Sequence, residues 1–239
     1  INKMLEKNWL DYWNRKNIWT ESNLWKKNND IFFNKTSNIF NYNSQHVVLD
    51  IGCGNGDFAE KISTKVSQVY CLDTSQEYIN ICENRFAHKK NIKVLKIDED
   101  YTNLSFIKDI KFSIIIANSV IQYYKSQNEV IELVKSIKKI SLKDAQFLIA
   151  DIEILGSKKS SILKLIFNSI KNRFFLSLIK TGIKLITNKE YYKTVERQPL
   201  LIIDIQKLID DLSHIVKEVR VVDDEITVSV NRKHLLIKI

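Results

Sequence analysis

The residues best suited to chemistry lie in one short stretch, where a carboxylate precedes three glycines. Asp50 ends an apolar run, and Gly52, Gly54 and Gly56 follow on alternate positions. Such glycines let the backbone turn sharply and let a ligand lie against it, because no Cβ is in the way. A negative charge at Asp50 repels a pyrophosphate and favours a cation, such as the ammonium of an amino-acid tail. The spacing therefore predicts a nucleotide-type ligand with a positively charged part.

Two strands and a helix must position this loop. The apolar run 47–50 is typical of a buried parallel strand, and 58–65 has a helical pattern. A second strand, 68–73, ends in Asp73 about twenty residues after the loop, where an acid often binds ribose hydroxyls. In open α/β sheets such loops meet at the carboxyl ends of the strands and bind nucleotides there.

The order Asp-x-Gly-x-Gly-x-Gly resembles the signature loop of the class I S-adenosylmethionine-dependent methyltransferases. The resemblance covers residues 46–153 well and the closing strands loosely. It implies S-adenosylmethionine as cofactor, with S-adenosylhomocysteine as product. The cofactor-binding residues that it implies are Asp50, Gly52, Gly54, Gly56, Asp73, Thr74, Asp98, Glu99 and Asn118. Among these, Asp98 would face the adenine amino group, and Glu99 would offer its backbone N–H. Since 54–59 also fits the dinucleotide pattern G-x-G-x-x-G/A, a nicotinamide oxidoreductase remains an alternative.

The rest of the chain predicts an α/β fold, a doubly wound and mostly parallel seven-stranded sheet of the Rossmann-like kind. The expected strands are 47–50, 68–73, 93–98, 112–118 and 145–151, followed by two or three closing strands in 217–222, 227–230 and 234–239, of which the last two fit a terminal hairpin. The expected helices of the core are 58–65, 75–86, 128–140 and 203–212, and Ser75 is a plausible N-cap. The resemblance implies that the last strand is antiparallel.

Four segments follow from this pattern. Residues 1–45 are expected to form an N-terminal helical lid and 46–155 the cofactor-binding core. Residues 156–198 form an inserted helical cap, and 199–239 a closing helix and strands. The single proline and the lack of a Pro/Ser-rich tether favour one core domain with appendages. All four tryptophans precede the first strand. Tyr12, Trp13 and Trp19 are candidates for the acceptor pocket, although packing on the sheet is the more common use of such rings.

The segment 156–198 interrupts the strand alternation with two amphipathic helices, 160–170 and 174–186, that carry interspersed lysines. A basic amphipathic helix can lie on a membrane surface. A cap over the substrate site fits the single-core interpretation better. Tyr191 and Tyr192 would then lie in a polar turn before Pro199, and Arg173, Lys193 and Arg197 would contact an anionic acceptor.

The formal charge of +9 accompanies an abundance of Lys, Asn and Ile along the whole chain. This distribution favours a compositional bias over a nucleic-acid surface. The three cysteines form no C-x-x-C pair, which indicates core residues of a reducing compartment. No signal-peptide pattern, no apolar run of about 18 residues and no compact Asp/Asn cluster is present. We therefore expect a cytoplasmic protein without a transmembrane segment or a metal site.

Methyl transfer needs an in-line acceptor and exclusion of water, and a general base only when the acceptor must lose a proton. No histidine is well placed. The weak candidates for a catalytic role are Tyr123, Asp151, Glu153, Tyr191 and Tyr192. We therefore expect O-methylation of an anionic or nucleotide- or phosphate-linked small molecule, such as a sugar or a biosynthetic intermediate. An RNA or protein methyltransferase and a non-catalytic cofactor-binding protein remain alternatives, and the oligomeric state is open.

Overall fold

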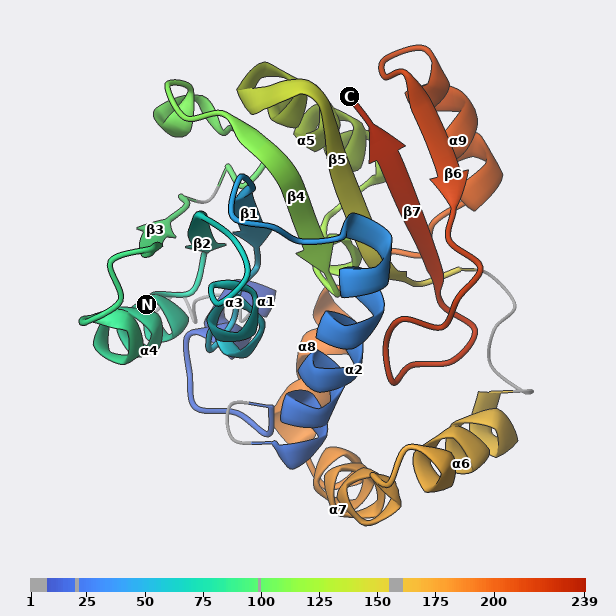
Figure 1. Ribbon diagram of the computed structural model, residues 1–239. Helices are drawn as coiled ribbons and strands as arrows, with labels where there is room; N and C mark the ends of the chain where they lie inside the picture. Colours follow the sequence, from blue (N-terminus) through green and yellow to red (C-terminus); the bar gives the residue numbers. More distant parts are fainter. Residues whose placement is uncertain (1–7, 20–21, 99, 155–160) are drawn as a thin grey trace, which may run out of the picture.

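A computed structural model describes residues 8–19, 22–98, 100–154 and 161–239, and shows a seven-stranded sheet of order β3-β2-β1-β4-β5-β7-β6 (Figure 1). The strands are β1 (Val47–Ile51), β2 (Gln68–Asp73), β3 (Ile92–Lys96), β4 (Phe112–Asn118), β5 (Ser141–Ile152), β6 (Glu218–Val221) and β7 (Lys233–Lys238). The first five are parallel, and β7 is antiparallel to β5 and β6. The predicted Rossmann-like, mostly parallel sheet is confirmed.

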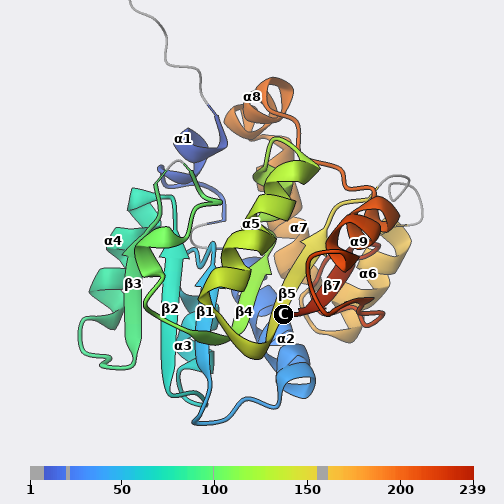
Figure 2. The same ribbon diagram turned by 90° about the horizontal axis from the view of Figure 1, so that it is seen from above.

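Helices cover both faces of this sheet. Those of the first half are α1 (Trp9–Trp13), α2 (Asn23–Phe40), α3 (Asp57–Ile62), α4 (Gln76–Phe86) and α5 (Gln127–Ile140). Those of the second half are α6 (Ser161–Lys171), α7 (Phe175–Ile186), α8 (Lys189–Arg197) and α9 (Ile205–Ser213). One apolar core lies between the sheet and α5 and α9, and a second lies between the sheet and α2, α3 and α4. Figure 2 shows α5 and α9 together on one face of the sheet.

Local sequence explains where the helices of the core begin. Ser75 caps α4 as predicted, because its side chain accepts a hydrogen bond from the backbone N–H of Tyr78. Gly56 precedes α3 with φ +80°, a left-handed conformation that glycine adopts without strain. The apolar residues of α5 recur on one buried stripe, as the sequence indicates.

Two local predictions are wrong. Residues 227–230 form no strand, since the Val228 N–H donates to the Asn28 side chain of α2 rather than to a neighbouring strand. Residues 191–197 form no polar turn but belong to α8, whose first turn is capped by the Asn188 side chain. Both corrections come from side-chain hydrogen bonds that satisfy backbone N–H groups, which residue periodicity does not reveal.

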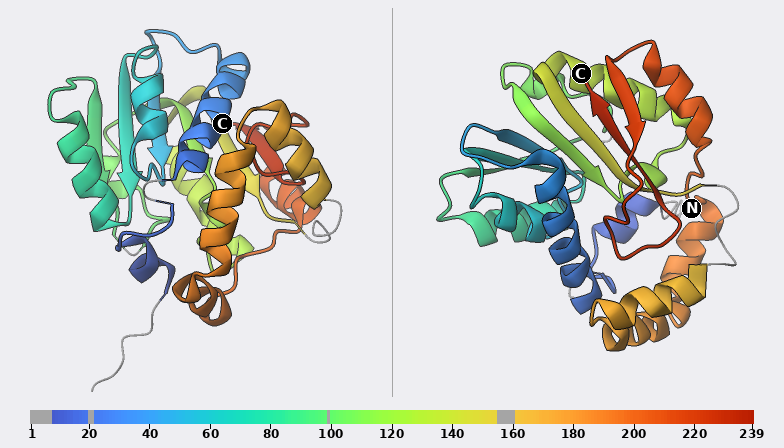
Figure 3. Two further views of the ribbon diagram at one scale, coloured as in Figure 1. Left: turned by 90° about the horizontal axis from the view of Figure 1, so that it is seen from below. Right: turned by 45° about the vertical axis from the view of Figure 1, so that its right-hand side comes forward.

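The helices outside the core gather beyond the carboxyl ends of the parallel strands. Helix α8 packs against α1, and α7 packs against α2 and α6. Figure 3 shows α6 and α7 as a pair at one end of the molecule, away from the sheet. The predicted segment boundaries stay a prediction, and the boundary at 155/156 lies outside the described residues. None of the described helices is long and apolar enough to cross a membrane.

Candidate functional site

A cavity of about 260 Å³ opens at the carboxyl ends of β1, β2 and β4. The strand ends contribute Ile51, Gly52, Gly54, Leu72, Asp73, Thr74, Ile97, Tyr101, Asn118, Ser119, Val120, Tyr123, Tyr124 and Lys125. The remaining lining residues are Asn8, Trp9, Leu10, Trp13, Trp25, Tyr78 and Gln198. The cavity thus lies where open α/β sheets bind their ligands, and apolar and aromatic side chains dominate its wall.

The three glycines of the loop have different surroundings, although all have positive φ. A Cβ at Gly52 would lie 2.4 Å from Val120 Cγ2, and a Cβ at Gly56 would lie 2.6 Å from the Phe86 ring. At Gly54 a Cβ would meet no atom within 4 Å. Gly54 therefore leaves open space at the cavity wall, whereas Gly56, outside the lining, is needed for packing on α4.

Two buried carboxylates lie close to the glycine loop, and one of them bonds it. Asp73 accepts hydrogen bonds from the backbone N–H of Gly54 (2.9 Å) and of Ser75 (2.8 Å). Asp50 is only 4% exposed, and its Oδ2 has no hydrogen-bond partner. Burial raises the pKa of Asp50 to about 8, with a further contribution from the charge of Asp73. Burial also raises the pKa of Asp73 to about 6, against the backbone hydrogen bonds that lower it. Asp73 lines the cavity, while Asp50 lies behind its wall.

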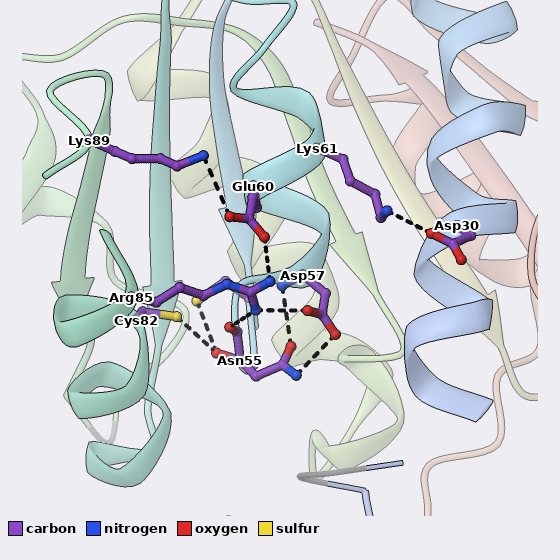
Figure 4. A network of polar contacts seen from close by, with 10 residues as sticks. Asp30, Asn55, Asp57, Glu60, Lys61, Cys82, Arg85 and Lys89 are labelled. Carbon is purple, nitrogen blue, oxygen red and sulfur yellow. Dashed lines mark hydrogen bonds and ion pairs between the residues drawn. The ribbon is translucent and has the colours of Figure 1, made fainter. Parts of the chain in front are cut away.

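A polar network fixes the junction of the glycine loop and α3 (Figure 4), and its side chains do not belong to the described lining of the cavity. The Asn55 side chain donates to Asp57 (3.0 Å), and the Asp57 N–H donates back to Asn55 Oδ1 (3.2 Å). Arg85 of α4 donates to the Asn55 carbonyl (2.9 Å) and to Asp57 Oδ1 (2.7 Å), and also pairs with Glu60. Cys82 donates to the Gly54 carbonyl. Helix α4 therefore positions the glycine loop.

Aromatic side chains from α1 and from the segment after β4 form another part of the cavity wall. Trp9 and Trp13 of α1 contact Tyr123, which lies in the 3-10 helix η2 (Ile121–Tyr123), with ring centroids 4.9 and 5.5 Å apart. Gln198 joins these elements, because its carbonyl accepts from Trp9 Nε1 (2.9 Å) and its side chain donates to the Tyr123 carbonyl (3.2 Å). Burial raises the pKa of the Tyr123 hydroxyl, so this side chain is a neutral wall residue.

A second aromatic pair in the cavity wall consists of Tyr101, after β3, and Tyr124, after β4. The rings of Tyr101 and Tyr124 lie 4.5 Å apart, and Tyr101 donates to Glu129 Oε2 (2.8 Å). Asn118 Oδ1 is buried at the cavity without a hydrogen-bond partner. Asp98 is exposed and does not line the cavity, and Glu99 lies outside the described residues.

The remaining candidate residues lie at various distances from this cavity. Tyr12 and Tyr191 pack in the aromatic cluster with Trp9, whereas Trp19 packs against Trp25. Arg173, Tyr192, Lys193 and Arg197 are exposed. None of these residues belongs to the described lining of the cavity, and their roles stay predictions.

Asp151 lies in a separate polar cluster at the end of β5. Its carboxylate accepts from Ser119 Oγ (2.6 Å) and lies 3.8 Å from Arg232 Nε, while Arg232 also pairs with Glu153 (2.9 Å). His234 Nδ1 accepts from the Asp151 N–H, and burial lowers the pKa of His234 to about 4. The contacts of this cluster join β5 to β7 and to the loop after β4. His234 thus serves as a buried neutral acceptor in this cluster.

Sequence reasoning missed several residues of the site. Gln198, Tyr101, Tyr124 and Lys125 line the cavity, and Arg85 orders its loop. Tyr101 and Tyr124 come a few residues after the carboxyl ends of β3 and β4, and this position in the chain could have indicated them. Gln198 lies 75 residues from its partner Tyr123, and no local pattern signals that contact. Among the described residues, no three His, Cys, Asp or Glu residues could hold a metal ion.

Three comparisons match this arrangement. Residues 48–155 match the model of the family described as methyltransferase domain. The chain is 25% identical over 105 residues to YqeM of Bacillus subtilis (strain 168), which is named as a methyltransferase. That match covers 44% of this chain and 41% of YqeM, so the chain spans less than half the length of this relative.

Two solved structures share the fold. One is a Methanococcus maripaludis protein described as an S-adenosyl-L-methionine-dependent methyltransferase, with TM-score 0.58 and 14% identity over 90% of this chain and 85% of the other. The second is the N-methyltransferase NodS of Bradyrhizobium japonicum WM9 with bound S-adenosyl-L-homocysteine. Its TM-score is 0.56 with 12% identity, over 96% of this chain and 94% of the other. At these identities the structures support the fold alone.

Proposed function

We propose that this chain, which contains a class I, Rossmann-like S-adenosylmethionine-dependent methyltransferase domain, transfers a methyl group from S-adenosylmethionine to a small acceptor. The acceptor that the cavity favours is an anionic or phosphate-linked molecule methylated on oxygen. The proposal concerns the activity of the whole protein, since the family match covers residues 48–155 only.

The residues at the cavity fit the cofactor. Asp73 would accept from the ribose hydroxyls, and Gly54 leaves space for a ligand against the backbone. The Oδ2 of Asp50 has no partner and lies behind the loop, where a bound sulfonium ligand with an ammonium group would favour the ionised form of this carboxyl. Asn118 Oδ1 is a further buried acceptor without a partner. When bound, the cofactor supplies the activated methyl group.

The acceptor proposal rests on one observation, the shortage of proton acceptors in the described lining. This part of the wall contains no histidine, and Asp73, its one carboxylate, already accepts two backbone hydrogen bonds. The wall tyrosines Tyr123 and Tyr124 have pKa values raised by burial, which disfavours a tyrosinate base. A site without a base suits an acceptor whose nucleophile is already ionised. Lys125, the one cation of the described lining, is able to hold such an acceptor.

The rings of Trp9, Trp13 and Tyr123 would keep water from the acceptor and hold it in line with the methyl group. In this mechanism the protein positions the acceptor and neutralises its charge, and no side chain needs to remove a proton. The rate should then follow the ionisation of the acceptor rather than that of a protein group.

The first test is calorimetry with S-adenosylhomocysteine and with NAD. Binding of the former in the micromolar range and none of the latter supports the cofactor assignment, and the reverse refutes it. The second is transfer of labelled methyl to a panel of carboxylates, sugar phosphates and nucleotide sugars, with neutral analogues as controls. Methylation of neutral amines alone would refute the acceptor class.

Basic residues give a finer test of the same proposal. Lys125→Gln should raise the KM for the acceptor about tenfold and leave the Kd for S-adenosylhomocysteine unchanged, because one partly desolvated ion pair is lost. We also propose that Arg173, Lys193 and Arg197, outside the described lining, contact the acceptor. Arg197→Glu tests this second group of cations and should likewise raise the KM for the acceptor. An unchanged KM in both variants would exclude an anionic acceptor.

A further inference from the structure

Helices α6 and α7 carry an apolar surface that no described part of the chain covers. Seven large apolar side chains on these helices are at least 36% exposed: Ile166, Phe167, Ile170, Leu176, Ile179, Ile183 and Ile186. Phe167, Leu176 and Ile186 are each more than 70% exposed. Isolated apolar side chains on a surface are ordinary, but seven of them on two helices that pack together indicate an interaction site. We call these seven residues the α6–α7 surface.

The spacing of these residues places them on one side of each helix. On α7 they recur at intervals of three and four residues, and the buried Thr181 lies on the opposite side, within 3.3 Å of Ser22 next to α2. On α6 the buried Ser169 likewise marks the inner side. Each helix therefore uses its inner side for packing and keeps a second apolar side exposed. Neither α6 nor α7 contributes a residue to the described lining of the cavity.

The charges beside the α6–α7 surface are all of one sign. From residue 161 to residue 189 the sequence contains no Asp or Glu, and its cations are Lys164, Lys171, Arg173, Lys180, Lys184 and Lys189. All six are exposed. By helical spacing, Lys164 and Lys171 lie beside the exposed apolar residues of α6, and Lys180 and Lys184 lie beside those of α7. Long basic side chains beside apolar ones are typical of helices that lie in a membrane interface.

We propose that the α6–α7 surface docks the protein on an anionic lipid bilayer, with the apolar side chains in the headgroup region and the lysines on lipid phosphates. A second copy of the chain is a poorer occupant, because a twofold contact would bring six cations against six. A nucleic acid would match the charge but would leave the apolar residues without a partner. The inference does not depend on the acceptor proposed above.

Flotation of the full chain with lipid vesicles tests this inference. The wild-type protein should float with phosphatidylcholine vesicles that contain about 30 mol% phosphatidylglycerol, and hardly with phosphatidylcholine alone. Raising the salt from about 0.1 M to about 0.5 M should weaken binding several-fold. No flotation on anionic vesicles, or equal flotation on neutral ones, overturns the proposal.

Variants separate the two parts of the interaction. Lys164→Gln, Lys171→Gln and Lys180→Gln together should lower the affinity roughly 100-fold, at about five-fold for each lysine near the surface. Phe167→Ser with Leu176→Ser should remove binding. Leu142→Ser and Lys143→Gln, two exposed residues at the opposite, amino end of β5, are the matched controls and should bind as the wild type.

Circular dichroism establishes that each variant is folded, and light scattering gives its oligomeric state. A dimer that dissociates on Phe167→Ser with Leu176→Ser, without flotation of the wild type, would assign the α6–α7 surface to a second copy and overturn the proposal. Salt-sensitive RNA binding that survives this apolar double substitution, again without flotation, would overturn it as well.

Discussion

The carboxylate of Asp50 should make the protein less stable as the pH rises from 6 to 8. Its pKa is raised to about 8 in the folded protein, mainly by burial, whereas the carboxyl of an unfolded Asp has its ordinary pKa of 3.8. Between these two values the native state binds more protons than the unfolded state. Stability therefore falls with rising pH in this window and levels off above about pH 8. We predict that Asp50→Asn, which keeps the shape and removes the charge, abolishes this fall.

The magnitude follows from the two pKa values. Each unit of pH within the window costs about 1.4 kcal/mol, and the loss between pH 6 and 8 is about 2 kcal/mol, because the slope declines near pH 8. His234, with a pKa lowered to about 4, acts in the opposite direction, mainly below pH 6.5. Asp73, with a pKa near 6, adds to the fall mainly below pH 6. Between pH 6 and 8 the remaining effects of His234 and Asp73 have opposite signs and partly cancel, so Asp50 dominates the change.

Urea unfolding at pH 6, 7 and 8 measures the effect. The wild type should lose about 2 kcal/mol over this range, and Asp50→Asn should lose a small fraction of that. Asp109→Asn, which alters an exposed carboxylate, is the control and should keep the wild-type slope. A saturating cationic cofactor should also flatten the wild-type curve, because a nearby cation favours the ionised carboxylate. Parallel pH curves for the wild type and Asp50→Asn would refute the reasoning.

Three further predictions test the walls of the cavity. Gly54→Ala should lose only about 1–2 kcal/mol of stability, because its φ is +55° but its Cβ has open space, and should bind S-adenosylhomocysteine at least tenfold more weakly. Gly56→Ala should lose more stability, because its Cβ would lie 2.6 Å from Phe86. Equal losses of the two variants on urea unfolding would contradict this contrast. Arg85→Ala should raise the Kd of S-adenosylhomocysteine by calorimetry. Lys89→Ala, just after α4, removes another cation that pairs with Glu60 and should leave the Kd unchanged, since Arg85 alone of the two bonds Asn55 and Asp57. Gln198→Ala should lower stability by about 1 kcal/mol and raise the acceptor KM more than the cofactor Kd, because the contact with the Tyr123 carbonyl is lost; equal shifts in KM and Kd would argue against a role on the acceptor side.

The sequence predicts the part of the cavity at the glycine loop better than the part that we propose for the acceptor. The resemblance to the class I family agrees with the methyltransferase-domain match of residues 48–155, and the first five strands lie at the apolar runs that the sequence indicates. Gly52, Gly54, Asp73, Thr74 and Asn118, all given from that resemblance, line the cavity. These residues lie on loops whose position is fixed by the strand just before them, so a local pattern is sufficient.

The acceptor side depends on contacts between segments far apart in the chain. Trp9 comes from α1, Tyr123 from η2 and Gln198 from the end of α8, and their hydrogen bonds span up to 189 residues. No periodicity in the sequence signals such a contact. The mistaken turn at 191–197 has the same origin, because the Asn188 cap and the packing of α8 on α1 decide its conformation.

The amphipathic pattern of residues 161–186 fits either a cap or a membrane-bound helix pair, because both need one apolar and one polar side. The burial of α6 and α7 favours the membrane-bound pair that we propose, while the cap stays a prediction for 156–198 as a whole. A cap would bury its apolar residues over the cavity, whereas Phe167, Leu176 and Ile186 are mostly exposed and the described lining includes no residue of α6 or α7. The following helix α8 packs on α1, and Gln198, just after it, bonds Trp9 at the cavity. Because α8 follows α7 in the chain, we expect that docking of α7 on a bilayer shifts α8 and with it the contact between Gln198 and Trp9. Vesicles should therefore change the acceptor KM more than the cofactor Kd.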